Sequence, residues 1–215
     1  MLIRRGDEAW WRSLAPPDVA WPGLGMETLR ADPRDYRMED LPDVRAVLQV
    51  GAPESYEIAF TPGQVINQGS RGACVACTDS HIASIYNLFD EGRWIDHDWL
   101  KLYTEMGGTG PNGVDVRGTL QKCVDLGCPR LGAGERDKFA RYAFAPLLLG
   151  QFEETLKAAI AVNRPCQLWL LLPSLFGWES GGSITSGYHS ITAVGYRPDA
   201  VKILNSWSAQ WGRGG

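Results

Sequence analysis

One cysteine stands where the local sequence could make it a nucleophile. Cys74 follows the glycine-rich stretch 67–73 and begins a run that reads as a helix. A helix N-terminus carries a partial positive charge and free N–H groups, which favour a thiolate over a thiol. The side-chain amide of Gln68, a few residues upstream, could donate a hydrogen bond to an oxyanion that forms near the sulfur.

Three stretches in chain order match the motifs of one protein family. Residues 68–74 read Gln-Gly-Ser-X-Gly-X-Cys before a helix, and residues 187–196 contain a strand-like run around His189. Residues 204–212 read Leu-Asn-Ser-Trp-X-X-X-Trp-Gly. Together they resemble the nucleophile, histidine and asparagine segments of papain-like cysteine peptidases (family C1, bacterial or phage type). Each motif alone is weak, whereas all three in the family's order form a strong signal.

The resemblance implies a hydrolase of the thiol-protease type that uses a Cys-His-Asn triad. Cys74 would be the nucleophile, and His189 the base that pairs with it as thiolate and imidazolium near neutral pH. Asn205 would fix the imidazole tautomer without adding charge. Gln68 and the backbone N–H of Cys74 would form the oxyanion hole. The expected reaction is endopeptidase hydrolysis through an acyl-thioenzyme.

The resemblance also suggests which residues contact the substrate. In the family, a glycine-bearing loop lines the cleft and pairs with the substrate backbone, and Asn112 and Gly113 occupy the matching positions here. Tyr188 stands before the histidine, where small or acidic residues are common, so it would form an unusual pocket wall. Trp207 would shield the histidine–asparagine hydrogen bond from water. The loop lacks the lysine and hydroxyl ending of a phosphate cradle.

Two departures from the family pattern leave other functions open. Val75 stands where the family usually has tryptophan, and the sequence reaches Gly215 without the expected Gly-Tyr strand. An edge of the sheet would then be uncovered, to be paired by a protein partner or by the N-terminal segment. The alternatives are a catalytically weak papain-like binding or assembly module, and an acyl transferase with the same triad.

The five cysteines and the charge balance restrict compartment and partners. Secreted relatives pair a cysteine at the position of Arg71, so its absence favours a reducing compartment. Cys74 and Cys77 form a CxxC pair with no second pair or histidine pair to complete a zinc site, so we expect no metal or cofactor. Cys77 is expected to pack inward, with a redox role of the pair as the minor alternative. A net charge of −4 gives no support to nucleic-acid binding.

No apolar run is long enough for a signal peptide or a membrane span. We therefore expect no membrane association, a peptide or protein substrate, and a protein that is cytoplasmic or released without a standard signal peptide. Release could be phage-mediated or through a secretion system.

The elements that must position these residues divide the chain into two halves. Helical patterns occupy the run from Cys74 and the segments 96–106, 116–126 and 152–161, and strand-like runs occupy 166–172, 190–196 and 201–204. The expected class is α+β. The resemblance implies a papain-like two-lobe fold, with a helical left lobe, an antiparallel β-barrel-like right lobe and an active-site cleft between them.

The 215 residues suit one domain with two lobes. We assign residues 1–55 to an N-terminal belt or short pro-segment and 56–215 to the catalytic domain, whose last strand is missing after Gly215. His81 is expected to be a surface histidine or a hydrogen-bonded structural one, and His97 to be solvated at the start of a helix.

Overall fold

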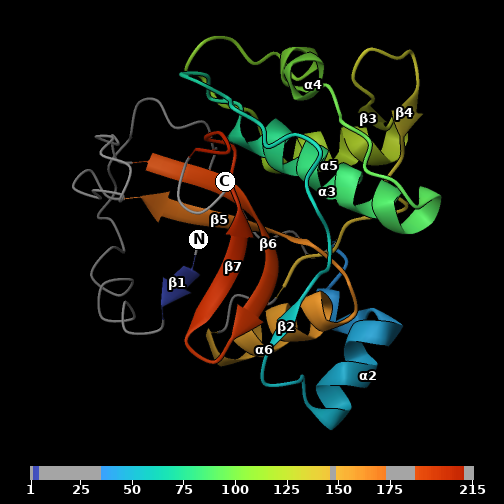
Figure 1. Cartoon of the computed structure of the whole chain (residues 1–215), viewed down its shortest axis with the longest axis vertical. Helices are drawn as coiled ribbons and strands as arrows, with labels where there is room; N and C mark the ends of the chain where they lie inside the picture. Colours follow the sequence, from blue (N-terminus) through green and yellow to red (C-terminus); the bar gives the residue numbers. More distant parts are fainter. Residues whose placement is uncertain (1, 5–34, 146–148, 173–186, 211–215) are drawn as a thin grey trace.

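The computed structural model describes residues 2–4, 35–145, 149–172 and 187–210 of the chain. Its fold is α+β, with helices on two sides of an antiparallel sheet (Figure 1). The helical elements are η2 (Met38–Asp40), α2 (Pro42–Val50), α3 (Cys74–Glu91), α4 (Trp99–Glu105), α5 (Val116–Asp125) and α6 (Leu149–Ala161). The strands are β1 (Leu2–Arg4), β2 (Tyr56–Glu57), β3 (Cys128–Pro129), β4 (Arg136–Asp137), β5 (Cys166–Leu172), β6 (Gly187–Arg197) and β7 (Ala200–Leu204).

Strand β6 is the centre of the main sheet. The strand order is β1-β7-β6-β2, with β5 also paired to β6, and every pairing is antiparallel. The predicted strands after residue 166 are all present. Over the described residues the sheet stays open, so it does not show the barrel-like closure that the resemblance implies.

The outer edge of β7 carries a strand from the start of the chain. β1 pairs with β7 in the register Leu2↔Lys202, Ile3↔Val201 and Arg4↔Ala200. Residues 2–4 therefore supply the backbone hydrogen bonds that an exposed edge would otherwise offer to another chain.

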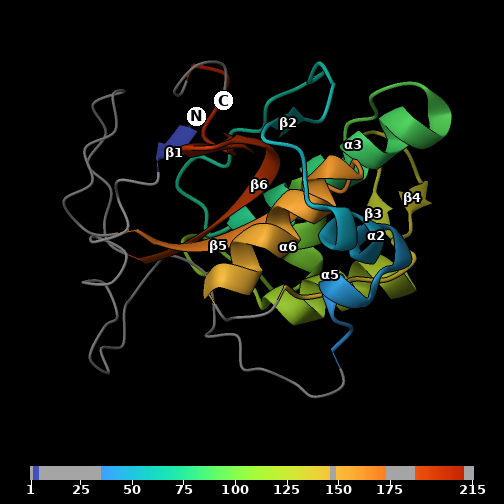
Figure 2. The same cartoon turned by 90° about the horizontal axis from the view of Figure 1, so that it is seen from below.

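Helix α3 is buried on nearly all sides because it lies between the sheet and helices α4 and α5 (Figures 1 and 2). Ile85 joins a core with α2, α6 and the sheet, whereas Cys77 joins a second core with α4 and α5. A helix in such an interior position is expected to be largely apolar, yet α3 also buries polar side chains such as Asp79 and His81. The two cores fix the start of α3, where Cys74 lies, relative to both layers.

Helix α2 has no counterpart among the helices predicted from sequence. It begins at Pro42, a residue whose fixed φ suits the first helical position, and it ends before Gly51 at φ +87°. Val44 is fully buried against the core, and Asp43 accepts a hydrogen bond from Arg164 at 2.9 Å. Residues 35–52 thus contribute to the same core as the sheet.

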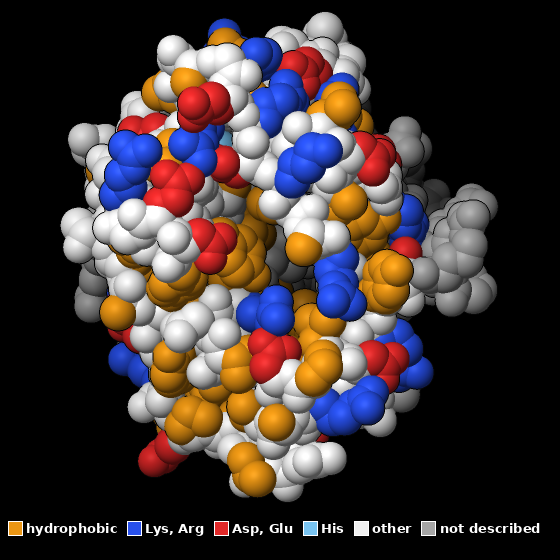
Figure 3. All heavy atoms as spheres, turned by 90° about the vertical axis from the view of Figure 1, so that its right-hand side faces the viewer, with side chains coloured by type: hydrophobic (Ala, Val, Ile, Leu, Met, Phe, Trp, Pro, Cys, Tyr) orange, Lys and Arg blue, Asp and Glu red, His pale blue; other side chains and the backbone are white. Residues whose placement is uncertain are grey.

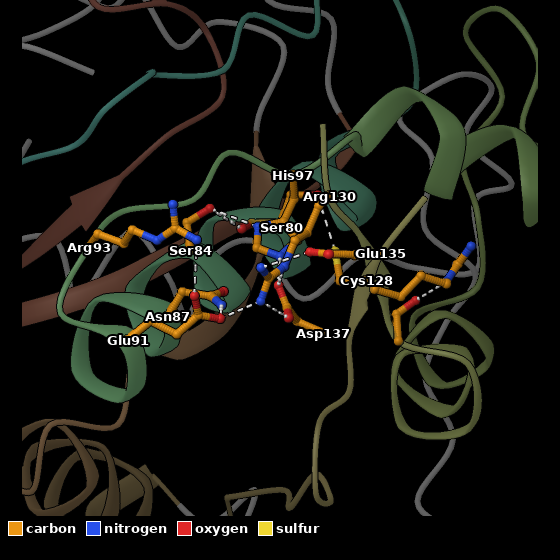
Figure 4. Close-up of polar contacts among 12 residues, drawn as sticks. Ser80, Ser84, Asn87, Glu91, Arg93, His97, Cys128, Arg130, Glu135 and Asp137 are labelled. Atoms are coloured by element: carbon orange, nitrogen blue, oxygen red, sulfur yellow. Dashed lines mark hydrogen bonds and ion pairs between the residues drawn. The ribbon is translucent and has the colours of Figure 1, made fainter. Parts of the chain in front are cut away.

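His97 is buried, not solvated as the sequence suggested. Its Nδ1 lies 3.0 Å from the Ser84 hydroxyl, and its Nε2 lies 2.8 Å from an oxygen of Asp137 (Figure 4). Arg130 donates hydrogen bonds to Asp137 and to Glu91. Asp137 belongs to β4 and Arg130 directly follows β3, so these contacts tie the β3–β4 pair to the buried imidazole. The network attaches that strand pair to α3, away from Cys74.

A large groove opens on the face that Figure 3 shows, with hydrophobic side chains on its walls and Lys and Arg at its rim. Its lining comes from η2, α3, α6, β5 and residues 136–145, and includes Phe144, Leu156 and Trp169. None of the four predicted catalytic residues is among the described residues that line it. No helix in the described part of the chain is long and apolar enough to cross a membrane.

Candidate active site

Cys74 is the first residue of α3, as the sequence predicts, and only 2% of its surface is exposed. Its own N–H has no partner within the helix because the first N–H groups of any helix lack one. The preceding loop packs closely on residues 107–113. A Cβ added to Gly72 would lie 2.4 Å from the carbonyl oxygen of Pro111, so only glycine fits there.

The ring of His189 is held by Asn205. The two side chains meet at 2.8 Å between Nε2 and Oδ1. Oδ1 also accepts a hydrogen bond from the backbone N–H of Ser206 at 2.8 Å, which identifies the atom facing the ring as the amide oxygen. An oxygen acceptor requires a proton on Nε2, so a neutral ring leaves Nδ1 free to accept one. Nδ1 is buried and has no hydrogen-bond partner within the described residues.

Trp207 lies flat against the histidine. The two rings are stacked, with centroids 4.5 Å apart and an interplanar angle of 22°. This position covers the ring and leaves Trp207 half-buried. The contact agrees with the shielding role predicted for Trp207.

Gln68 connects the nucleophile loop to the segment after β7. Its backbone N–H donates to the carbonyl of Ser206 at 2.9 Å, and its Oε1 accepts from the Ser206 hydroxyl. Its Nε2 donates to the carbonyl of Arg71 at 2.7 Å. An amide nitrogen has two hydrogens, so one N–H remains for an oxyanion.

A buried pair of hydroxyls joins the helix of Cys74 to the strand of His189. Ser190 Oγ donates to Thr78 Oγ1 at 3.0 Å, and Gln167 Nε2 donates to Ser190 Oγ at 2.8 Å. The backbone N–H of Ser190 donates to the thiol of Cys74. The sulfur therefore lies against the residue that follows the histidine. Sequence reasoning missed Thr78 and Ser190, whose contact joins residues 112 positions apart.

Burial controls the protonation of both reacting groups. Desolvation raises the pKa of Cys74 to about 11, although backbone N–H groups partly oppose this shift. Desolvation also lowers the pKa of His189 to about 4, partly opposed by the hydrogen bond to Asn205. Both shifts favour the neutral forms of these groups at pH 7. Burial thus opposes the predicted thiolate–imidazolium pair, which stays a prediction.

Two other ionisable side chains of α3, Asp79 and His81, are buried. Neither carboxylate oxygen of Asp79 has a hydrogen-bond partner in the described part of the chain, and burial holds its pKa well above the usual range. Burial lowers the pKa of His81 to about 3, and its Nε2 accepts from the backbone N–H of Ile66 at 3.5 Å. The structural role predicted for His81 is confirmed.

The four residues predicted to bind substrate differ in how closely the structure places them to Cys74 and His189. Asn112 is exposed and Gly113 half-buried in the loop that packs on Gly72. Tyr188 is half-buried and is placed near the site only as the neighbour of His189 on β6. Cys77 is fully buried, as expected, and no group of described residues is arranged to hold a metal ion.

Comparison with solved structures decides the fold. Xylellain, a cysteine protease from Xylella fastidiosa, superposes with a TM-score of 0.69 at 20% identity, over 90% of this chain and 87% of xylellain. The chain has the papain-like fold. The resemblance found in the sequence is thus confirmed at the level of fold.

Two other cysteine proteases also superpose on this chain, with lower TM-scores. The procathepsin B S9 of Trypanosoma congolense superposes with a TM-score of 0.62 at 15% identity, covering 90% of this chain and 78% of that one. The Carica candamarcensis cysteine protease CMS1MS2, solved in complex with E-64, gives 0.57 at 23% identity, with coverages of 76% and 86%. The sequence matches no protein-family model and no curated protein.

Proposed function

We propose that this chain is a cysteine peptidase that hydrolyses peptide bonds through an acyl-thioenzyme. The observation that carries the proposal is the hydrogen bond from His189 Nε2 to Asn205 Oδ1, which leaves Nδ1 as a proton acceptor. Cys74 is the nucleophile of this proposal, and its thiol lies beside Ser190 on the same strand. The papain-like fold supports the assignment.

The residues that take part come from both layers of the fold, which supports a two-lobe arrangement. The helical lobe consists of α3, α4 and α5 and carries Cys74, whereas the sheet lobe carries His189 and Asn205. A substrate in the cleft between the lobes would contact Asn112 and Gly113 on one side and Tyr188 and Trp207 on the other. The domain assignment of 1–55 and 56–215 is part of this proposal.

The first chemical step transfers one proton and forms one bond. Because the thiol and the imidazole are both neutral at pH 7, the proton passes from Sγ to His189 Nδ1 as sulfur attacks the substrate carbonyl carbon. Asn205 stabilises the imidazolium through Nε2. The oxyanion accepts hydrogen bonds from the N–H of Cys74 and the remaining N–H of Gln68.

The second half of the reaction restores the enzyme. The imidazolium gives its proton to the leaving amine as the C–N bond breaks, which leaves a thioester on Cys74. A water molecule then attacks this thioester while His189 accepts its proton, and the acid product leaves with the thiol regenerated. Attack by an amine in place of water would give acyl transfer through the same intermediate.

The proposed peptidase function extends to the substrate class, a partner and the compartment. The substrate class is a peptide or protein, and a partner strand at the β7 edge would have to displace β1. All five cysteines are free and buried, which suits a reducing environment in the cytoplasm or delivery without a standard signal peptide.

The neutral, buried thiol of Cys74 favours one competing function, a catalytically weak binding or assembly module. Incubation with E-64, followed by intact-mass and peptide mapping, separates the two. We expect one stoichiometric adduct on Cys74, none in Cys74→Ala, and casein hydrolysis that Cys77→Ala largely retains. Absence of both the adduct and casein hydrolysis in the wild type would support the binding module.

A further inference from the structure

Tyr103 on α4 is a fully buried tyrosine whose hydroxyl reaches the loop 107–113. The residue is 1% exposed, and its ring lies beneath Gly108, where an added Cβ would be 2.1 Å from the ring. Its hydroxyl donates to the carbonyl of Gly110 at 3.0 Å and to the carbonyl of Asn112. One hydroxyl hydrogen therefore holds two carbonyls of the same loop.

The loop has a second attachment on the nucleophile side. The backbone N–H of Gly72 donates to the carbonyl of Gly110 at 2.9 Å. Gly110 thus accepts hydrogen bonds from the Tyr103 hydroxyl and from the loop that leads to Cys74. These two donors, together with the backbone N–H of Gly108, which donates to the carbonyl of Tyr103 at 2.9 Å, attach the loop to α4 and to the segment before Cys74.

These bonds leave part of the loop backbone available. Pro111 and Asn112 are exposed, and Gly113 makes no backbone hydrogen bond within the described part of the chain. Both the N–H and the C=O of Gly113 can therefore pair with an extended peptide. A strand-like pairing of this kind requires the loop to hold one shape, because mobile backbone loses conformational entropy when it binds.

We propose that Tyr103 is a positioning residue that holds the loop 107–113 in the shape that binds an extended peptide beside Cys74. The inference rests on the proposed peptidase function. Tyr103 acts through the loop and does not touch the reacting atoms. A phenylalanine at position 103 keeps the ring under Gly108 and removes only the hydroxyl. The two carbonyls then turn to water, since the loop is exposed, and the loop moves while the core stays packed.

The test compares two thiol reagents that differ in their need for the loop. E-64 carries a peptide-like portion, whereas iodoacetamide is too small to contact residues 107–113. Second-order rates of Cys74 modification are measured by mass spectrometry for the wild type, Tyr103→Phe and the control Tyr56→Phe. Tyr56 also donates one hydroxyl hydrogen bond, to Asn163 at 3.0 Å, but it lies on β2.

We expect Tyr103→Phe to slow E-64 about five- to tenfold, the effect of one lost hydrogen bond, with the iodoacetamide rate changed less than about twofold. Tyr56→Phe should change neither rate. Equal slowing of both reagents in Tyr103→Phe would show a general structural role and overturn the inference, as would unchanged rates.

Casein hydrolysis separates this inference from the proposed function. A wild type that forms the E-64 adduct but does not cleave casein refutes the peptidase and still decides the role of Tyr103 through the two rates. A wild type that hydrolyses casein and shows no Tyr103 effect keeps the function and refutes the inference. A wild type that forms no E-64 adduct overturns the inference, and one that also fails to cleave casein overturns both.

Discussion

The change Asn205→Asp tests whether the hydrogen bond at His189 Nε2 controls the protonation of the ring. It replaces the amide oxygen, 2.8 Å from Nε2, with a carboxylate oxygen at the same place. The wild-type pKa of His189 is about 4 because burial disfavours the imidazolium. A carboxylate in contact with a cation typically shifts a pKa by 1–3 units, so the His189 pKa in Asn205→Asp should be about 5–7.

The same shift has a consequence for stability. The folded-state pKa of about 4 lies below the ordinary value of 6.5, so the unfolded chain binds a proton more readily between these two pH values. The stability of the wild type is therefore full above pH 6.5 and falls as the pH drops through 4. At 1.36 kcal/mol per pKa unit, the loss from His189 amounts to about 3 kcal/mol. Asn205→Asp should reduce this acid loss.

The measurement is a histidine NMR titration, which is practicable because the chain has only three histidines. Asn205→Ala is the matched control, since it removes the hydrogen bond that raises the His189 pKa and should lower this pKa further. Opposite shifts in the two variants support the geometry. A His189 pKa that moves the same way in both, or in neither, refutes the reasoning about Nε2.

Three further predictions concern residues around Cys74. Asp79→Asn should raise the free energy of unfolding at pH 7 by about 1.4 kcal/mol for each unit by which folding raises the Asp79 pKa, because the raised folded-state pKa makes the wild type lose stability as the pH rises above 3.8. Urea unfolding at pH 3 and pH 7 measures this gain, and an equal gain at both pH values would contradict the prediction. Thr78→Val should leave the Ser190 hydroxyl with one partner fewer and lower kcat about tenfold, since an unpaired buried polar group costs about 1–3 kcal/mol. Thr78→Ser keeps the hydroxyl and should retain activity, so loss of activity in both variants would count against this role. Gly72→Ala should lower the midpoint of thermal unfolding, because the added Cβ would lie 2.4 Å from the carbonyl oxygen of Pro111 and overpacking costs about 1–3 kcal/mol. An unchanged midpoint would show that the loop before Cys74 and the loop 107–113 are not in contact.

Local patterns in the sequence predicted the elements that carry the site. The glycine-rich stretch before a helical run placed Cys74 at the first position of α3, and the strand-like runs placed His189 on β6 and Asn205 just after β7. The start of a helix and the position of a strand depend on residues close together in the chain, so a single sequence is enough to predict them. Helix α2 was missed because it is short and offers only one turn or two of apolar spacing.

Contacts between distant segments could not be predicted in the same way. Nothing near Tyr103 in the sequence indicates that its hydroxyl holds a loop, and nothing near Thr78 points to Ser190. His97 was expected at the surface because its burial comes from β3 and β4, which follow later in the chain. The effect of burial on the pKa of Cys74 could not be predicted for a related reason: the sequence reveals the helix N-terminus, whereas desolvation depends on the whole fold.

The hydrogen bonds between Gln68 and Ser206 join residues that are 138 positions apart, which matters while the protein is being made. At about 5–20 residues per second, a ribosome needs about 7–28 s to synthesise the segment between them. During this interval α3 exists without the strands that cover it, so its apolar surface depends on chaperones or on nascent structure for protection. The same delay keeps Cys74 apart from His189 until the final strands emerge, so an unfinished chain lacks the complete site of the proposed peptidase.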